Sequence, residues 1–107
     1  MQFNYFDIMA RAQKGYARLL SPICKRYDLT RNELDVLLFL HNNPEYDRAA
    51  DIVAHRGMVK SQVSTSVANL EERGMLVRSA DAEDRRTVHL KLTKPAGEIA
   101  QAGRNLQ

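Results

Sequence analysis

The sequence has few of the residues on which several classes of protein depend. It has a single cysteine, Cys24, so an internal disulfide is excluded. No stretch approaches the roughly 20 consecutive apolar residues that a transmembrane helix needs. The N-terminus also lacks the basic-then-apolar order of a secretory signal. We therefore expect a cytoplasmic protein that does not use a membrane.

Metal-binding and catalytic patterns are also missing. His41, His55 and His89 lie far apart, and neither H-x-x-x-H nor C-x-x-C spacing occurs. There is no Ser-His-Asp ordering, no glycine-rich phosphate loop and no pair of carboxylates in an apolar setting. We expect no metal, no cofactor and no enzyme activity.

Length and charge limit the remaining classes. A chain of 107 residues with 44% hydrophobic content is predicted to form one domain with a modest core. The net charge of +3 and the isoelectric point near 9.2 permit binding of a polyanion, but they fall short of a strongly basic DNA-coating protein.

Helical periodicity dominates the N-terminal part of the chain. From Asn4 to about Tyr27, apolar residues recur every three or four positions, which predicts a long helix with a break near Ser21-Pro22. The apolar stripe is wide enough to bury one face in its own domain and another in a partner subunit. We assign residues 1–28 to this helix and expect it to support dimerisation.

The next helix is predicted to be the centre of the core. Thr30 and Glu33 form a capping box at its start, and Leu29 and Leu34 have the spacing of a hydrophobic staple. The run from Leu34 to Leu40 is nearly all apolar, and Asn42-Asn43-Pro44 ends it.

A short helix is predicted to follow. Asp47 is its expected N-cap, Ala50, Ile52 and Val53 are expected to point inward, and Gly57 closes it.

Another helix is predicted from Val59 to Arg73, closed by Gly74. Its core-facing residues are expected to be Val63, Val67 and Leu70. The opposite face is small and polar where a solvated helix usually carries lysine and glutamate. Such side chains can read base edges, and Lys60 can meet a phosphate. The candidate DNA-contacting residues of this helix are Lys60, Ser61, Gln62, Ser64, Thr65 and Asn69. The alternative is an ordinary polar helix surface.

Two neighbours favour the DNA interpretation. The short helix precedes the polar one at the spacing of a helix-turn-helix, whose second helix enters the major groove. After it, Met75–Ser79 and Thr87–Leu92 read as two strands. Val88, Leu90 and Leu92 are expected inward, and His89 outward near DNA. The predicted fold is mainly α with a small β-hairpin: a winged helix-turn-helix preceded by a long helix.

The sequence resembles the MarR family of bacterial transcriptional regulators. The motifs that carry the resemblance are Leu29-Thr30, Lys60 to Ser64, Leu70 to Arg78, Asp81 to Arg86 and Leu92-Thr93. The resemblance implies a homodimer on a pseudo-palindromic operator, usually repressing and often released by a small-molecule effector or by oxidation. It also implies that Asp84 orients a wing arginine, and that Arg85 or Arg86 enters the minor groove.

The chain departs from the family pattern in two respects. Asp81, Glu83 and Asp84 outnumber Arg85 and Arg86, so the wing tip is expected to be net negative and a weak electrostatic clamp. The final helix is expected to begin at Thr93 as N-cap, but little sequence follows it, so we expect most of the usual dimerisation region to be missing. We divide the single domain, residues 1–107, into residues 1–28, a winged helix-turn-helix over 29–92 with its wing at 80–87, and 93–107.

Cys24 and Tyr16 form a candidate redox or ligand site. Lys25 and Arg26 are expected to lower the pKa of the Cys24 thiol, whereas the alternative is a buried small side chain near a helix end. A ligand pocket, if the domain has one, is expected between the N-terminal helix and the body, lined by Tyr16, Leu20, Leu37 and Phe39, which read equally well as core.

Two functions remain open from the sequence. The first is a sequence-specific transcriptional regulator that binds double-stranded DNA as a dimer. The second is a protein-interaction module with the same fold, which binds another protein or a full-length homologue and does not itself bind DNA.

Overall fold

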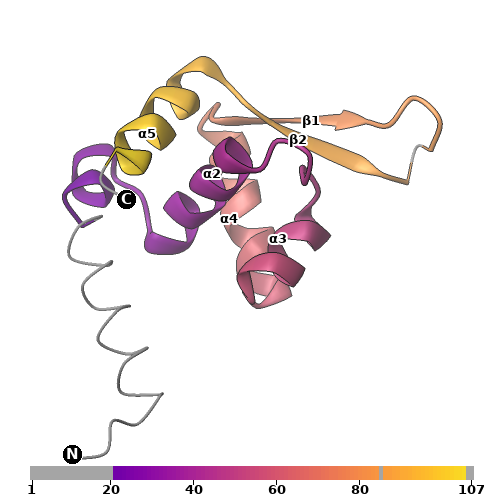
Figure 1. Ribbon diagram of the computed structural model, residues 1–107, viewed down its shortest axis with the longest axis horizontal. Coiled ribbons are helices and arrows are strands. Elements are labelled where there is room, and N and C mark those ends of the chain that lie inside the picture. The colour runs from indigo at the N-terminus through magenta and orange to yellow at the C-terminus, as the bar shows by residue number, and fades with distance from the viewer. Residues whose placement is uncertain (1–20, 85, 106–107) are drawn as a thin grey trace, which may run out of the picture.

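The computed structural model describes residues 21–84 and 86–105 of the chain. Residues 21–27 are helical. The elements that follow are α2 (Arg31–Asn42), α3 (Ala49–Arg56), α4 (Lys60–Glu72), β1 (Leu76–Ala80), β2 (Val88–Leu92) and α5 (Lys94–Arg104). The predicted fold class, mainly helical with a small β-hairpin, is confirmed (Figure 1). The earlier part of the predicted N-terminal helix lies outside the described residues.

Helix α2 is the centre of the core, as predicted. Thr30 and Glu33 form the expected capping box: the Glu33 amide donates to Thr30 Oγ1 over 3.1 Å, and the Thr30 amide donates to Glu33 Oε1 over 2.7 Å. The apolar residues from Leu34 to Leu40 are all buried. The helix packs against α4, α5 and β2, so it fixes the positions of the elements around it.

Helices α3 and α4 form the helix-turn-helix. Gly57 ends α3 in the left-handed conformation, with φ of 64°. Gly74, with φ of 74°, lies one residue beyond the α4 cap residue, and the Met75 amide donates to the Leu70 carbonyl over 2.9 Å. This bond pattern is a Schellman motif, which favours glycine at the left-handed position.

Two expectations for α3 are wrong. Arg48, not Asp47, occupies the N-cap position, and its amide donates to the Asp51 carboxylate over 3.2 Å. The Asp47 carboxylate is instead hydrogen-bonded to His89. Ala50 is exposed, whereas Ile52 is fully buried. The buried face of this short helix is therefore narrower than the face predicted from its apolar residues.

The hairpin pairs β1 and β2 in antiparallel register, with Leu76 opposite Leu92 and Ala80 opposite Val88. Leu76 and Leu90 are buried. Val88 lines a hollow with the buried Leu90 and Val67, so it lies on the predicted face, but it is 37% exposed. The reason is visible in Figure 1, where the hairpin projects beyond the helices on the side away from α5.

Helix α5 packs on α2 through a face of small residues and one isoleucine. The buried residues of this face are Ala96, Ile99, Ala100 and Gly103. Thr93 lies at the N-cap position but does not cap the helix with its side chain. Its hydroxyl donates instead to the Gly74 carbonyl over 2.8 Å, and its amide donates to the Met75 carbonyl over 3.1 Å. Thr93 therefore joins the end of β2 to the segment that links α4 to β1.

Candidate nucleic-acid interface

The solvent face of α4 carries the residues that the sequence selects for DNA contact. Val63, Val67 and Leu70 are buried as predicted. The exposed residues of the helix include all six candidates: Lys60, Ser61, Gln62, Ser64, Thr65 and Asn69. Within this set Lys60 is the single charged side chain, so the face offers mainly neutral donors and acceptors.

A polar hollow extends this face onto the N-terminus of α2. The hollow has a volume of about 290 Å³. Its lining consists of Thr30, Asn32, Ser61, Gln62, Thr65, Ser66 and Asn69. Asn32 was not selected from the sequence, because its position in the capping segment of α2 gives no sign that α4 lies beside it. The folded chain brings together uncharged polar groups from two helices.

The other side of α4 borders an apolar hollow of about 310 Å³. Its lining comes from α3 and the first turn of α4, and consists of Ala49, Ala50, Val53, Ala54, Lys60, Val63 and Ser64. The exposed Ala50 that departs from the sequence expectation lies here. Polar and apolar surfaces therefore flank the same helix.

The acidic residues of the wing shape its backbone. Asp81 Oδ2 accepts from the amides of Glu83 and Asp84 over 3.1 and 3.0 Å. Asp84 Oδ1 accepts from the Arg86 amide over 3.0 Å, and its Oδ2 accepts from the Thr87 hydroxyl over 3.4 Å. Asp84 thus holds the main chain of Arg86, whereas the resemblance implies that it orients an arginine side chain. Arg85 lies outside the described residues.

His89 joins the wing to the helix-turn-helix. Its Nδ1 lies 2.7 Å from Asp47 Oδ1, and its Nε2 lies 2.9 Å from Asp81 Oδ1. The hydrogen bond with Asp47, followed by the one with Asp81, raises the pKa of His89. The hydrogen bond with His89 is the largest cause that lowers the pKa of Asp81. His89 was expected outward near DNA; its side chain is 34% exposed, and carboxylates hold both of its ring nitrogens.

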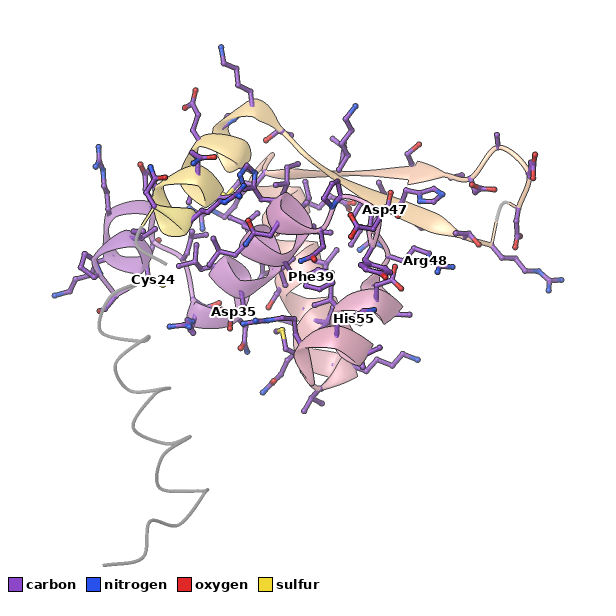
Figure 2. All side chains as sticks on the ribbon, in the orientation of Figure 1. Cys24, Asp35, Phe39, Asp47, Arg48 and His55 are labelled. Atoms are coloured by element: carbon purple, nitrogen blue, oxygen red, sulfur yellow. The ribbon has the colours of Figure 1, made fainter. Side chains whose placement is uncertain are left out.

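Asp47 belongs to the segment between α2 and α3, and Figure 2 shows it beside the hairpin, next to Arg48. Its carbonyl also accepts from the Leu90 amide over 2.7 Å. This junction could not be predicted from the sequence, because Asp47 and His89 are 42 residues apart.

Of the two residues of the candidate redox site, Cys24 lies within the described residues. Cys24 is half-buried, and burial raises the pKa of its thiol, with Arg31 lowering it to a smaller extent. Lys25 and Arg26, which were expected to lower this pKa, are not among the causes. Tyr16 lies outside the described residues.

Two of the four residues expected to line a ligand pocket fall within the described residues, and both belong to the core. Leu37 and Phe39 are both buried in the hydrophobic core, and Leu20 lies outside the described residues. His41 lies in the last turn of α2 and pairs with Gln101, and His55 is exposed on α3, where its ring contacts that of Tyr46. Among the residues that the structure describes, no group of histidine, cysteine and carboxylate side chains is arranged to hold a metal ion.

A helix-turn-helix followed by an antiparallel hairpin, packed on a central helix, defines a winged helix-turn-helix protein. In the described ranges, no helix is long and apolar enough to cross a membrane. The model of the MarR family matches residues 27–87, and the chain belongs to this family.

Solved structures have the same fold. MepR of Staphylococcus aureus in its DNA-binding conformation is 20% identical, with a TM-score of 0.84 over 97% of this chain and 77% of that one. A MepR–DNA complex is 21% identical, with a TM-score of 0.72 over 95% and 74%. NadR in complex with 4-hydroxyphenylacetate is 19% identical, with a TM-score of 0.82 over 99% and 75%. The fold is therefore that of MarR-family winged-helix regulators.

Proposed function

We propose that this protein is a transcriptional regulator that binds a specific sequence of double-stranded DNA, with α4 in the major groove. The observation that carries the proposal is the exposed face of α4, which is polar, nearly uncharged and placed as the second helix of a helix-turn-helix. Uncharged polar side chains suit base edges, whereas a face built for phosphates alone would be rich in lysine and arginine. The relatives point the same way, since one of them was solved bound to DNA.

The residues of this face divide by their chemistry. Ser61, Gln62, Ser64 and Thr65 would approach base edges, since a glutamine amide can pair with adenine in the major groove. Lys60 and Asn69 would contact the DNA backbone. Asn32 of α2 lines the same polar hollow as Asn69 and adds a second amide there. The apolar hollow along α3 would accept the methyl group of a thymine.

The wing would add contacts in the neighbouring minor groove. Arg86 is exposed, and its main chain is held by Asp84. Arginine fits a narrow minor groove because of that groove's negative potential. Arg85 and Arg86 are the wing residues that would contact DNA, and Asp84 would act by fixing the backbone of Arg86.

A dimer would supply the affinity that one domain lacks. A single module buries roughly 600–1,000 Å² on DNA, whereas a two-fold dimer places two recognition helices about 34 Å apart on successive major-groove turns. We propose a homodimer on a pseudo-palindromic operator, acting as a repressor in the bacterial cytoplasm. A small-molecule effector is consistent with NadR, which was solved with 4-hydroxyphenylacetate.

The test is selection of bound duplexes from a random pool at two salt concentrations, followed by the stoichiometry of the complex. We expect an enriched palindromic site bound by two chains. The double variant R85A/R86A should bind this site about tenfold or more weakly. The control K94A/R104A removes the same charge from α5, away from the wing, and should bind like the wild type.

The substitution Q62A tests base reading separately. It should reduce discrimination at one base pair by about 1–3 kcal/mol while leaving binding to unrelated duplexes unchanged. Absence of DNA binding by the wild-type chain even at low salt would contradict the proposal and favour the protein-interaction module.

A further inference from the structure

His89 occupies a junction of three chain segments, of which the one that carries Asp47 is distant from the hairpin in sequence. Asp47 precedes α3, His89 lies in β2, and Asp81 follows β1 at the base of the wing. Both ring nitrogens of His89 are within hydrogen-bonding distance of a carboxylate oxygen, at 2.7 and 2.9 Å. The three side chains are each about one-third exposed, with fractions of 34%, 32% and 35% for His89, Asp47 and Asp81.

The number of protons on the His89 ring decides whether the ring can bind both carboxylates. A neutral imidazole has one N–H group and one lone pair, whereas an imidazolium has two N–H groups. Ionised carboxylates only accept hydrogen bonds. Two carboxylates on the two ring nitrogens therefore require the charged ring. After loss of the proton, one of the short contacts would place a lone pair against a carboxylate oxygen and become repulsive.

The same residues connect the wing tip to the helix-turn-helix. The second oxygen of Asp81 accepts from the Glu83 and Asp84 amides, so this carboxylate holds the wing turn and His89 together. On the other side, the Asp47 carbonyl accepts from Leu90 of β2. A continuous set of hydrogen bonds thus runs from the wing turn through His89 to the residue that precedes the N-cap of α3.

We propose that His89 is a positioning residue of the DNA interface: in its charged form it braces the wing against the helix-turn-helix, and loss of its proton releases the wing and weakens DNA binding. The part that concerns DNA rests on the proposed function. The brace consists of Asp47, His89 and Asp81. The brace would act by holding the wing in a fixed position relative to α4. The wing and α4 could then contact DNA together, and the hairpin would lose less conformational entropy on binding.

Other charged groups near His89 do not replace the brace. His41 of α2 and Lys91 of β2 border the same hollow as His89 and Asp47. The His41 ring pairs with Gln101, and Lys91 lies opposite Val77 in the hairpin.

On β1, Ser79 opposite His89 is neutral, and Arg78 pairs with Glu71. Beside the Asp47 side, Arg48 pairs with Asp51. His41 is therefore the other histidine that borders this hollow, and it serves as the control.

The direction of the pH effect follows from the pKa shifts. The pKa of His89 lies above its ordinary value of 6.5 because of Asp47 and Asp81. The brace is therefore complete below pH 6.5, and it is lost as the pH rises through the raised pKa of His89. The pKa of Asp81 lies below its ordinary value of 3.8, so the contribution of Asp81 is complete above pH 3.8 and is lost as the pH falls through that lowered pKa.

The first measurement concerns the brace alone. Titration of the three histidine ring signals by NMR should give His89 a pKa above 6.5 in the wild-type chain. The variant D47N removes one charge while keeping an acceptor oxygen, and it should lower the pKa of His89. The control E45Q removes a charge from the same segment and should leave it unchanged. An unshifted His89 in the wild type, or no response to D47N, overturns the brace.

The second measurement is the affinity for the selected duplex between pH 6 and pH 9. Wild-type affinity should fall about threefold to tenfold as His89 loses its proton, the size expected of two partly exposed charge pairs. H89Q should bind at the lower level at every pH, and H89R, which stays charged, should keep an affinity that does not change with pH. H41Q should retain the wild-type profile.

The two measurements separate the brace from the proposed function. A wild-type affinity that does not change with pH, or an H89Q variant that keeps the pH dependence, overturns the role of His89 in DNA binding. If the wild type binds no DNA at any pH, the proposed function fails and the DNA part of this inference fails with it. The NMR titration still decides whether the brace exists.

Discussion

Gly103 of α5 packs directly on the side chain of Leu38 of α2, so closely that a Cβ atom at Gly103 would lie 2.8 Å from Leu38 Cδ2. Leu38 is 3% exposed and has little room to turn away. This contact is part of the surface that joins α5 to the core helix.

We expect G103A to destabilise the domain. Overpacking typically costs about 1–3 kcal/mol, and alanine recovers at most about 1 kcal/mol over glycine in a helix, less near a helix end. The net loss should be about 1 kcal/mol in the free energy of unfolding, measured by urea denaturation. G97A is the matched control, because nothing lies within 4 Å of a Cβ atom there and the same exchange should stabilise α5. Equal effects of the two changes would contradict the close contact.

Arg73 should couple the N-terminal helical segment to the end of α4. Its Nη1 donates to the Asp28 carbonyl and its Nη2 to the Tyr27 carbonyl, each over 2.7 Å. R73A should lower the free energy of unfolding by about 1 kcal/mol, since the bonds are exposed. It should also speed exchange of the Leu29 amide, which donates to the Cys24 carbonyl.

The variant R73K separates charge from geometry. Lysine keeps the charge but lacks the planar fork that reaches two carbonyls. Its stability and Leu29 exchange rate should therefore stay close to those of R73A. Wild-type behaviour of R73K would show that the charge alone suffices.

Cys24 should react slowly at neutral pH. Burial raises the pKa of its thiol from the ordinary 9.0, and the thiolate is the reactive species. Alkylation by iodoacetamide at pH 7 should be slower in the folded chain than in urea. In the folded chain, the rate should keep rising at pH values at which a free thiol is already fully ionised. A folded-state rate above the unfolded one would restore Cys24 as a redox candidate.

Thr93 should stabilise the junction between the hairpin and α5 through its hydroxyl. T93V keeps the shape but removes the donor to the Gly74 carbonyl, and should cost about 0.5–1.5 kcal/mol of unfolding free energy. T93S keeps the donor and should lose less. The measurement is urea unfolding of both variants, and a T93V variant as stable as the wild type would contradict this role.

The features that the sequence predicted correctly depend on neighbours along the chain. The capping box of Thr30 and Glu33 joins residues three positions apart, and the two faces of α4 follow from helical periodicity. Both features depend on residues of a single helix, so they can be predicted without knowledge of the tertiary fold.

The features that the sequence missed depend on contacts between distant segments. Asp47 has the side chain of an N-cap, but His89 binds it from another element. Val88 alternates correctly along its strand, yet its position is exposed because the hairpin extends past the helices. Asn32 joins the polar surface of α4 because α2 packs beside that helix. Periodicity carries no information about where an element ends relative to its neighbour.

The small-residue face of α5 has a mechanical consequence. Apart from Ile99, the buried residues of this face are small, and Gly103 lies against the side chain of Leu38 of α2. We therefore expect α5 and α2 to move as one unit, so that a displacement of α5 would shift the core helix on which α4 packs.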